Sequence, residues 1–144
     1  MATLRDLLAI KGHELVAVHP GDSVLHAANL MNERNIGGVV VLEGDQLAGI
    51  FTERDVLRRV VAPGLDPATT AVAAVMTTPV IICKPELSID DCAALMTTRS
   101  VRHLPVRDAS GLTGMVTMRD LLAHQVSEQQ ATIAQMNSYL FDLR

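Results

Sequence analysis

The sequence predicts an α/β (α+β) fold made of two copies of a β-α-β-β-α unit, on three grounds. Shifting the chain by 65 positions aligns residues 16–57 with residues 81–122 without a gap. Within each copy, short β-rich runs alternate with a stretch in which apolar residues recur at helical spacing. Between the copies, the segment "APGLDPATT" has the Pro and Gly residues typical of a connector. The chain is therefore one structural unit repeated.

Each copy is expected to begin with a strand and a helix. A short apolar run stops at a proline in both copies, at Val16–Val18 and at Val80–Cys83, as a strand would. Ser23 and Ser88 follow as helix-start signals. The apolar residues after them recur at helical spacing: Val24, Ala27, Ala28, Leu30 and Met31, and Ile89, Cys92, Ala93, Leu95 and Met96.

A hairpin and a second helix complete each copy. The turns "EGDQ" and "DASG" contain the Gly, Asp and Ser residues that hairpins use. A helix is expected to start after Thr52 and after Thr117. The expected strand pairs are Val39–Leu42 with Gln46–Phe51, and Leu104–Arg107 with Leu112–Val116.

Short helical lead-ins, "TLRDLLAI" and "TAVAAVMT", precede the two copies. We therefore expect a first repeat with its lead-in over residues 1–62, a linker over 63–71, a second repeat with its lead-in over 72–125 and a C-terminal helix over 126–144. A unit of about 60 residues is marginally stable alone. The repeats are expected to pack face to face around a pseudo-twofold axis, with clefts at the seam between them.

Composition argues against several classes of protein. A chain of 144 residues with 49% hydrophobic residues is expected to fold compactly. Its net charge of -4 and pI near 5.6 give no general attraction for nucleic acid or an anionic membrane. The sequence has no readable signal peptide or membrane span, so a cytoplasmic protein is expected. Cys83 and Cys92 are expected to be buried free thiols.

One phrase occurs in both copies: "GIFTERD" at residues 49–55 and "GMVTMRD" at residues 114–120. Its aspartate carboxylate can accept a hydrogen bond from each of two adjacent ribose hydroxyls. Its threonine stands at the start of a helix, where free N–H groups and the helix dipole favour a phosphate. Its glycine leaves room for backbone or for a ligand. The residues concerned are Gly49, Thr52 and Asp55, and Gly114, Thr117 and Asp120.

These features resemble the cystathionine-β-synthase (CBS) domain family, whose members occur as tandem pairs called Bateman modules. The resemblance covers about residues 1–125 and rests on the repeated unit, on "VRHLPVRDASGLTGMVTMRDLL" and on the phrase in both copies. It implies a nucleotide site in which the aspartate binds the ribose hydroxyls and the threonine lies near ribose or phosphate. It also implies a regulatory module, because nothing in the sequence resembles the catalytic portion of the enzyme that names the family.

The same spacing has a purely structural interpretation. Thr-x-x-Asp before an apolar run is also a capping box, in which the threonine caps the helix and the acid reaches back to the cap N–H. The lead-in "TLRDLL" at Thr3–Leu8 is a third example, with no glycine before it and no repeat around it. Helix capping alone, or capping together with ribose binding, would account for the phrase.

The two copies differ beside the phrase. Gly37 and Gly38 of the first copy align with Arg102 and His103 of the second. Arginine and histidine supply hydrogen-bond donors for phosphate, whereas glycines supply space and bare backbone amides. The second copy is therefore the expected anionic site, unless its two residues form only a solvated surface.

Two further arginines lie within the phrase itself. Arg54 and Arg119 would either reach the phosphates of a bound nucleotide or face solvent in the first helical turn. Val40 of the first copy also departs from the family's usual proline, which the second copy has at Pro105.

The sequence offers no catalytic or metal-binding motif. It contains no phosphate loop of the ATPase type, no G-x-G-x-x-G fingerprint, no G-x-S-x-G elbow and no H-E-x-x-H or Cys/His cluster. We therefore expect no enzyme activity, no metal and no prosthetic group.

The C-terminal segment predicts an amphipathic helix that covers a surface. Its apolar residues fall mostly three, four or seven positions apart: Leu122, Val126, Ile133, Met136, Leu140 and Leu143. The covered surface would belong to the same chain or to a second subunit, and the family resemblance implies a homodimer.

The function expected from the sequence is a regulatory module that binds an adenine nucleotide, AMP, ADP or ATP, in the clefts between the repeats and signals to an unidentified partner protein. NADH and S-adenosylmethionine are further candidate ligands. The alternative is a dimerisation or protein-interaction module with vestigial clefts, in which the phrase serves only as a helix cap.

Overall fold

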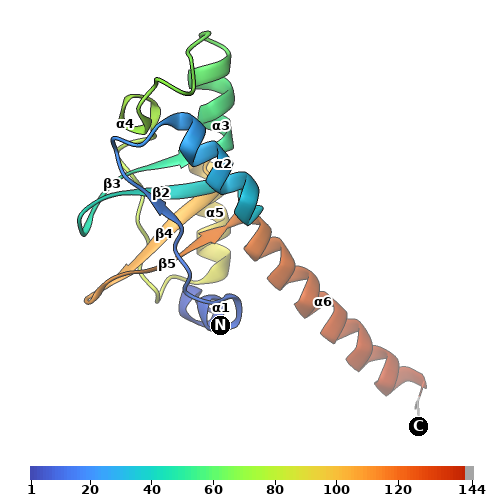
Figure 1. Cartoon of the computed structure of the whole chain (residues 1–144). Coiled ribbons are helices and arrows are strands. Elements are labelled where there is room, and N and C mark those ends of the chain that lie inside the picture. The colour runs from blue at the N-terminus through green and yellow to red at the C-terminus, as the bar shows by residue number, and fades with distance from the viewer. Residues whose placement is uncertain (142–144) are drawn as a thin grey trace. The chain divides into compact units, whose positions relative to one another are not determined.

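The computed structural model describes residues 1–141, and the chain forms two compact units (Figure 1). The first-repeat unit consists of Glu14–Ile82, and the second-repeat unit consists of Met1–His13 together with Cys83–Arg144. Both units mix helices and strands, which confirms the predicted α/β fold class.

The first-repeat unit contains a three-stranded sheet with the order β1-β2-β3. Strand β1 pairs parallel with β2, and β2 pairs antiparallel with β3. Helix α2 begins after Ser23, whose hydroxyl accepts the N–H of His26 at 3.0 Å, so the predicted cap is confirmed. The elements are β1 (Ala17–Val18), α2 (Val24–Arg34), β2 (Gly38–Glu43), β3 (Gln46–Thr52), α3 (Glu53–Asp55), the π-helix η1 (Val56–Val61) and α4 (Val72–Val75).

The second-repeat unit repeats this plan around the hairpin β4–β5. Ser88 caps α5 by accepting the N–H of Asp91 at 3.0 Å. Both hairpins form where the sequence predicts them. The elements are α1 (Leu4–Lys11), α5 (Ile89–Arg99), β4 (His103–Asp108), β5 (Gly111–Thr117) and α6 (Met118–Phe141).

The strand predicted over Val80–Cys83 is wrong, because only Cys83 forms a bridge there, parallel to Val106. The cause lies in the neighbouring strand. In the first repeat, Val40 donates its N–H to Val16 O at 3.1 Å. The equivalent residue of the second repeat is Pro105, which has no N–H to donate. The parallel ladder is therefore reduced to one bridge.

Each lead-in packs in the unit of the other repeat. The N–H groups of Leu4 and Arg5 donate to the carbonyls of Leu87 and Pro85, both at 2.9 Å, within the second-repeat unit. The equivalent bonds of the first-repeat unit run from Val72 to Asp22 at 2.8 Å and from Ala73 to Pro20 at 2.9 Å. Along the sequence each lead-in precedes one repeat, and within the compact units it packs with the other repeat.

Buried apolar side chains hold each unit together by removing apolar surface from water. The core cluster of the first-repeat unit comprises Val18, Val24, Ala27, Met31, Val39, Val41, Phe51, Val60, Val72 and Val75. Buried apolar residues of the second-repeat unit include Leu4, Leu8, Cys83, Ile89, Cys92, Met96, Leu104, Val106, Val116 and Leu121.

The two cysteines are buried and free, as predicted. A hydrogen bond with Cys83, together with burial, raises the pKa of the Cys92 thiol far above its ordinary value of 9.0. Cys92 is therefore held as a thiol at neutral pH and packs as a small apolar side chain.

The last helices of the two repeats differ. In the first repeat, α3 is followed by the π-helix η1, in which Ala62 donates to Leu57 O at 2.9 Å. In the second repeat, α6 is a single helix of 24 residues (Figure 1). The predicted C-terminal helix over 126–144 is thus continuous with the repeat's own last helix, and Leu143 lies outside the described residues.

Candidate functional site

The repeated phrase lies where each hairpin ends and the next helix begins. Gly38 pairs with Thr52 in the first repeat, and His103 pairs with Thr117 in the second. Just after each threonine, a backbone N–H closes the junction, from Glu53 to Gly37 O at 3.0 Å and from Met118 to Arg102 O at 2.9 Å. Each repeat therefore brings its two variable residues beside its own threonine.

Both aspartates cap their helices. The N–H of Thr52 donates to Asp55 Oδ2 at 3.0 Å, and Asp55 N–H donates back to Thr52 Oγ1 at 3.4 Å. The matching distances for Thr117 and Asp120 are 2.8 Å and 3.2 Å. The phrase forms a capping box in both repeats, as its structural interpretation predicted.

Asp55 is enclosed by protein. It is 5% exposed, and its Oδ1 accepts a hydrogen bond from Thr77 Oγ1 at 2.9 Å. The Nε of Arg59 lies 3.6 Å from the same oxygen. Together with the cap at Oδ2, these contacts engage both oxygens of the carboxylate, so the first-repeat aspartate has its hydrogen-bonding needs met within its own unit.

Asp120 is more open. Its side chain is 20% exposed, against 6% for Asp55. The ammonium of Lys11, at the end of the first lead-in helix, forms an ion pair with Asp120 Oδ2 and also donates to Met115 O. The cap and the ion pair of Asp120 both use Oδ2, whereas the contact of Asp55 with Thr77 uses Oδ1.

The motif glycines make room for the lead-in segments. A Cβ at Gly49 would lie 2.6 Å from Met76 Sδ and 3.0 Å from the carbonyl oxygen of Thr77. A Cβ at Gly114 would lie 2.8 Å from Leu8 Cδ2. The sequence left open whether this space serves the protein or a ligand. In both units the lead-in fills it.

The variable residues also differ in their surroundings. A Cβ at Gly37 would come within 3.0 Å of Glu53 Oε1, so the Glu53 side chain covers this glycine. Arg102 is exposed and His103 half-buried at the equivalent position. The second repeat thus presents a cationic side chain to solvent where the first presents a glutamate.

The two motif arginines differ in exposure. Arg119 is exposed, and Arg54 is half-buried with an interaction partner of its own. Arg119 therefore adds a second exposed cation beside the second-repeat motif.

Three residues around the two aspartates were not anticipated from the sequence: Lys11, Arg59 and Thr77. Arg59 and Thr77 lie outside the repeated phrase, and Lys11 is explained locally as a cation at a helix C-terminus. The packing of the lead-ins could have pointed to Thr77 and Lys11, because each lead-in packs within the unit of the other repeat. Placing the second lead-in on the first repeat would have brought Thr77 close to Gly49.

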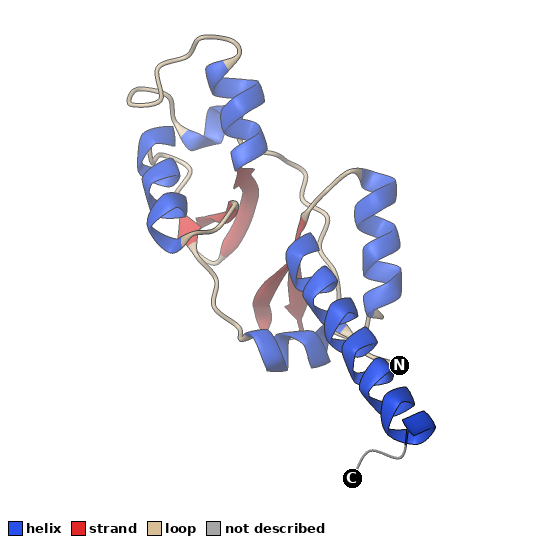
Figure 2. Ribbon diagram, turned by 90° about the vertical axis from the view of Figure 1, so that its right-hand side faces the viewer, coloured by secondary structure: helices blue, strands red, loops and turns tan. Residues whose placement is uncertain are grey.

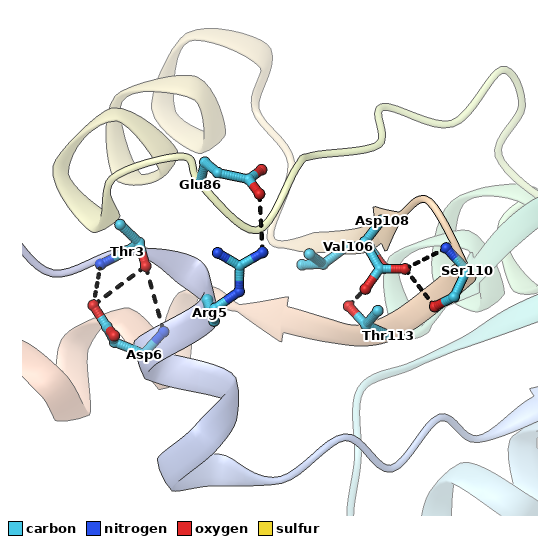
Figure 3. Close-up of polar contacts among 8 residues, drawn as sticks. All are labelled: Thr3, Arg5, Asp6, Glu86, Val106, Asp108, Ser110 and Thr113. Carbon is cyan, nitrogen blue, oxygen red and sulfur yellow. Dashed lines mark hydrogen bonds and ion pairs between the residues drawn. The ribbon is translucent and has the colours of Figure 1, made fainter.

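The third Thr-x-x-Asp capping box has the same local geometry without the rest of the motif (Figure 3). The N–H of Thr3 donates to Asp6 Oδ2 at 2.9 Å, and Asp6 N–H donates to Thr3 Oγ1 at 3.4 Å. The hydrogen bonds from the Thr3 backbone and hydroxyl lower the pKa of Asp6 below its ordinary value of 3.8. Asp6 thus provides a matched example of capping alone.

The described residues contain neither a metal-ligand cluster nor a helix that could span a membrane. Within residues 1–141, no three His, Cys, Asp or Glu side chains are grouped as ligands of a metal ion would be. Over the same part of the chain, no helix combines the length and apolar character needed to cross a bilayer.

The duplicated β-α-β-β-α unit, with a capped Thr-Asp pair at the end of each hairpin, defines a tandem-repeat α/β module. Comparison with known families identifies which one. The CBS domain profile matches residues 5–62 and again residues 72–127. The chain therefore belongs to the CBS domain family and carries two copies of the domain.

Individual proteins support this assignment. The chain is 33% identical over 137 residues to the CBS domain-containing protein YhcV of Bacillus subtilis, covering 95% of each. A solved structure of a protein with CBS domains from Burkholderia ambifaria is 37% identical, with a TM-score of 0.86 over 89% of this chain and 96% of that one. The hexameric CBS-CP12 protein from bloom-forming cyanobacteria is 29% identical, with a TM-score of 0.75 over 85% of this chain and 70% of that one.

Proposed function

We propose that this chain is a cytoplasmic ligand-sensing module that binds an adenine nucleotide, AMP, ADP or ATP, and signals its presence to a partner protein. The observation that carries the proposal is the second-repeat aspartate. Asp120 is fixed by its cap and ion pair at Oδ2, and it is partly exposed. A fixed carboxylate with an oxygen directed to a ligand is suited to a ribose hydroxyl.

The surroundings of Asp120 suit an anionic ligand. Lys11 forms an ion pair with the carboxylate, exposed Arg119 precedes Asp120 in the chain, and exposed Arg102 accepts the backbone N–H of Met118 through its carbonyl. Cationic donors of this kind bind phosphate oxygens, and Lys11 would stay on Oδ2 while a ribose hydroxyl bonds to Oδ1. The proposed ligand therefore combines a diol with phosphate, as adenine nucleotides do.

The first-repeat motif is the weaker candidate. A ligand hydroxyl would have to displace Thr77 from Asp55 Oδ1, and the carboxylate is almost inaccessible. Breaking a hydrogen bond to a buried charged group costs about 1.5–3 kcal/mol. We therefore propose that the second-repeat motif binds first and more tightly.

Signalling would require the ligand to bind two conformations of the module with unequal affinity. A ligand changes a conformational equilibrium only when it binds one state better than another. The second-repeat motif joins residues from β4, β5 and α6 to the lead-in helix α1. A ligand that bonds to both Asp120 and Lys11 would therefore strengthen the anchorage of α1, a change that a partner protein could recognise. The module itself is proposed to have no catalytic role.

The test is isothermal titration of the intact chain with AMP, ADP, ATP, NADH and S-adenosylmethionine. We expect micromolar binding of at least one adenine nucleotide, and a loss of about 10- to 100-fold in affinity for Asp120→Asn, because a charge-assisted contact becomes a neutral one. The asparagine keeps a side-chain oxygen for the Thr117 N–H, so the cap is retained.

Asp6→Asn is the matched control, because it makes the same change in a capping box that has no proposed ligand. The affinity of the Asp6→Asn variant for the nucleotide should equal that of the wild type. Absence of heat from every ligand, with the protein folded by circular dichroism, would contradict the proposal and favour an interaction module with vestigial clefts. Equal losses for the two variants would show that the effect is structural.

A further inference from the structure

Helix α6 continues far beyond the part that packs on its own unit (Figure 2). Leu121 is 1% exposed and anchors the helix, whereas every residue from Gln125 to Leu140 is exposed. At 1.5 Å per residue, this exposed segment is about 24 Å long. An isolated helix of this length is marginal in water, so a partner is needed to stabilise it.

The exposed apolar residues of α6 follow a seven-residue repeat. In heptad notation, Val126, Ile133 and Leu140 occupy a positions, and Leu122, Gln129 and Met136 occupy d positions. The five apolar members are 50–64% exposed. A strict a/d stripe is the narrow seam of a coiled coil, whereas a helix packed on a globular surface shows a wider apolar face. The expected partner is therefore another helix with the same period.

The positions beside this seam fit an identical helix. The e and g positions hold Ala123, Gln125, Gln130, Thr132, Asn137 and Tyr139, none of which is charged. Two identical chains would repel one another if these positions carried like charges. Glu128 lies at a c position outside the seam, where it contacts His124 at 3.2 Å.

We propose that α6 forms a parallel two-stranded coiled coil with α6 of a second copy of this chain. Two β-branched residues at a favour two parallel strands, and a single polar residue in the seam fixes the register. Gln129 would meet its counterpart across the twofold axis, where the two amides can hydrogen-bond to each other. This dimer does not depend on nucleotide binding, and failure of one proposal leaves the other intact.

Analytical ultracentrifugation of the intact chain tests the proposal with Ile133→Glu and Ser138→Glu. The first places a charge in the middle of the seam, and the second places the same charge at an exposed f position. We expect the wild type to be a dimer and Ser138→Glu to dimerise with the same affinity. For Ile133→Glu, we expect the affinity of dimerisation to fall by about 100-fold or more. A monomeric wild type, or a dimer that survives Ile133→Glu, would overturn the proposal.

Cross-linking tests the orientation of the two helices. In a parallel coiled coil, Val126→Cys lies beside its own counterpart and should form an intermolecular disulfide on mild oxidation. Ser127→Cys, at an outer b position, is the control and should remain reduced. The native cysteines do not interfere because both are buried. Cross-linking that is no faster for Val126→Cys than for Ser127→Cys would contradict the parallel arrangement.

Discussion

The two motif aspartates occupy equivalent positions and have the same cap, yet their environments differ. The Asp55 side chain is 6% exposed and contacts Thr77 as well as its capping threonine. Asp120 has a side chain that is 20% exposed and forms an ion pair with Lys11. Since Thr77 and Lys11 both belong to lead-in segments, the difference between the sites arises outside the repeated phrase.

This comparison shows how duplicated sites diverge without loss of the motif. The phrase fixes the helix start, the cap and the close approach of the lead-in at its glycine. The lead-in then determines which other group reaches the aspartate. Buried Asp55 contacts the Thr77 hydroxyl and Arg59, whereas partly exposed Asp120 forms an ion pair with Lys11.

The largest effect is expected at the motif glycines. Gly49→Ala should lower the free energy of unfolding by about 2–3 kcal/mol, because the new methyl meets Met76 and the Thr77 carbonyl that bonds to Ile50. Gly114→Ala should cost less, about 1–2 kcal/mol, because the closest atom is the end of the Leu8 side chain. Urea unfolding measures both.

Gly21→Ala is the control, because nothing lies within 4 Å of its Cβ position. It should change stability by less than about 0.5 kcal/mol. Equal stability of Gly49→Ala and Gly21→Ala would contradict the packing of the second lead-in against the first repeat.

A smaller effect is expected at the contacts that distinguish the aspartates. Thr77→Val keeps the side-chain shape and removes the hydrogen bond to buried Asp55, so it should cost about 2 kcal/mol. Lys11→Met removes a partly exposed ion pair with Asp120 and should cost about 0.5–1 kcal/mol. Thermal unfolding of the two variants gives the order directly. A larger cost for Lys11→Met would reverse the proposed difference between the sites.

The smallest effect is expected at the third capping box. The pKa of Asp6 is lowered by the Thr3 hydrogen bonds, so its stabilising contribution is present above the ordinary pKa of 3.8 and is lost as the pH falls through the folded-state value. Asp6→Asn should therefore lower the Tm slightly at about pH 7 and less at about pH 3. A difference from wild type that grows on acidification would contradict this sign.

Much of the fold was predictable because its signals are local. The repeat, the Ser23 and Ser88 caps and both hairpins follow from residues close together in the sequence. The strand expected near Cys83 failed for a non-local reason, since Pro105 of a neighbouring strand lacks the N–H that Val40 donates in the first repeat.

The candidate site was predictable only in part. The repeated phrase identified Asp55 and Asp120 and predicted their capping boxes. It did not identify the lead-in residues beside them, because both lead-ins have similar apolar patterns and either could pack on either repeat. The choice depends on tertiary packing, such as Leu8 against Gly114, which no local propensity encodes.

Titration of Asp55→Asn and Asp120→Asn with the same adenine nucleotide, with folding verified by circular dichroism, compares the two sites most directly. If the second repeat is the principal nucleotide site, Asp120→Asn weakens binding by about 10-fold or more, while Asp55→Asn stays within about twofold of the wild type. Greater loss for Asp55→Asn, or binding that neither variant changes, would contradict the assignment of the second repeat as the principal nucleotide site.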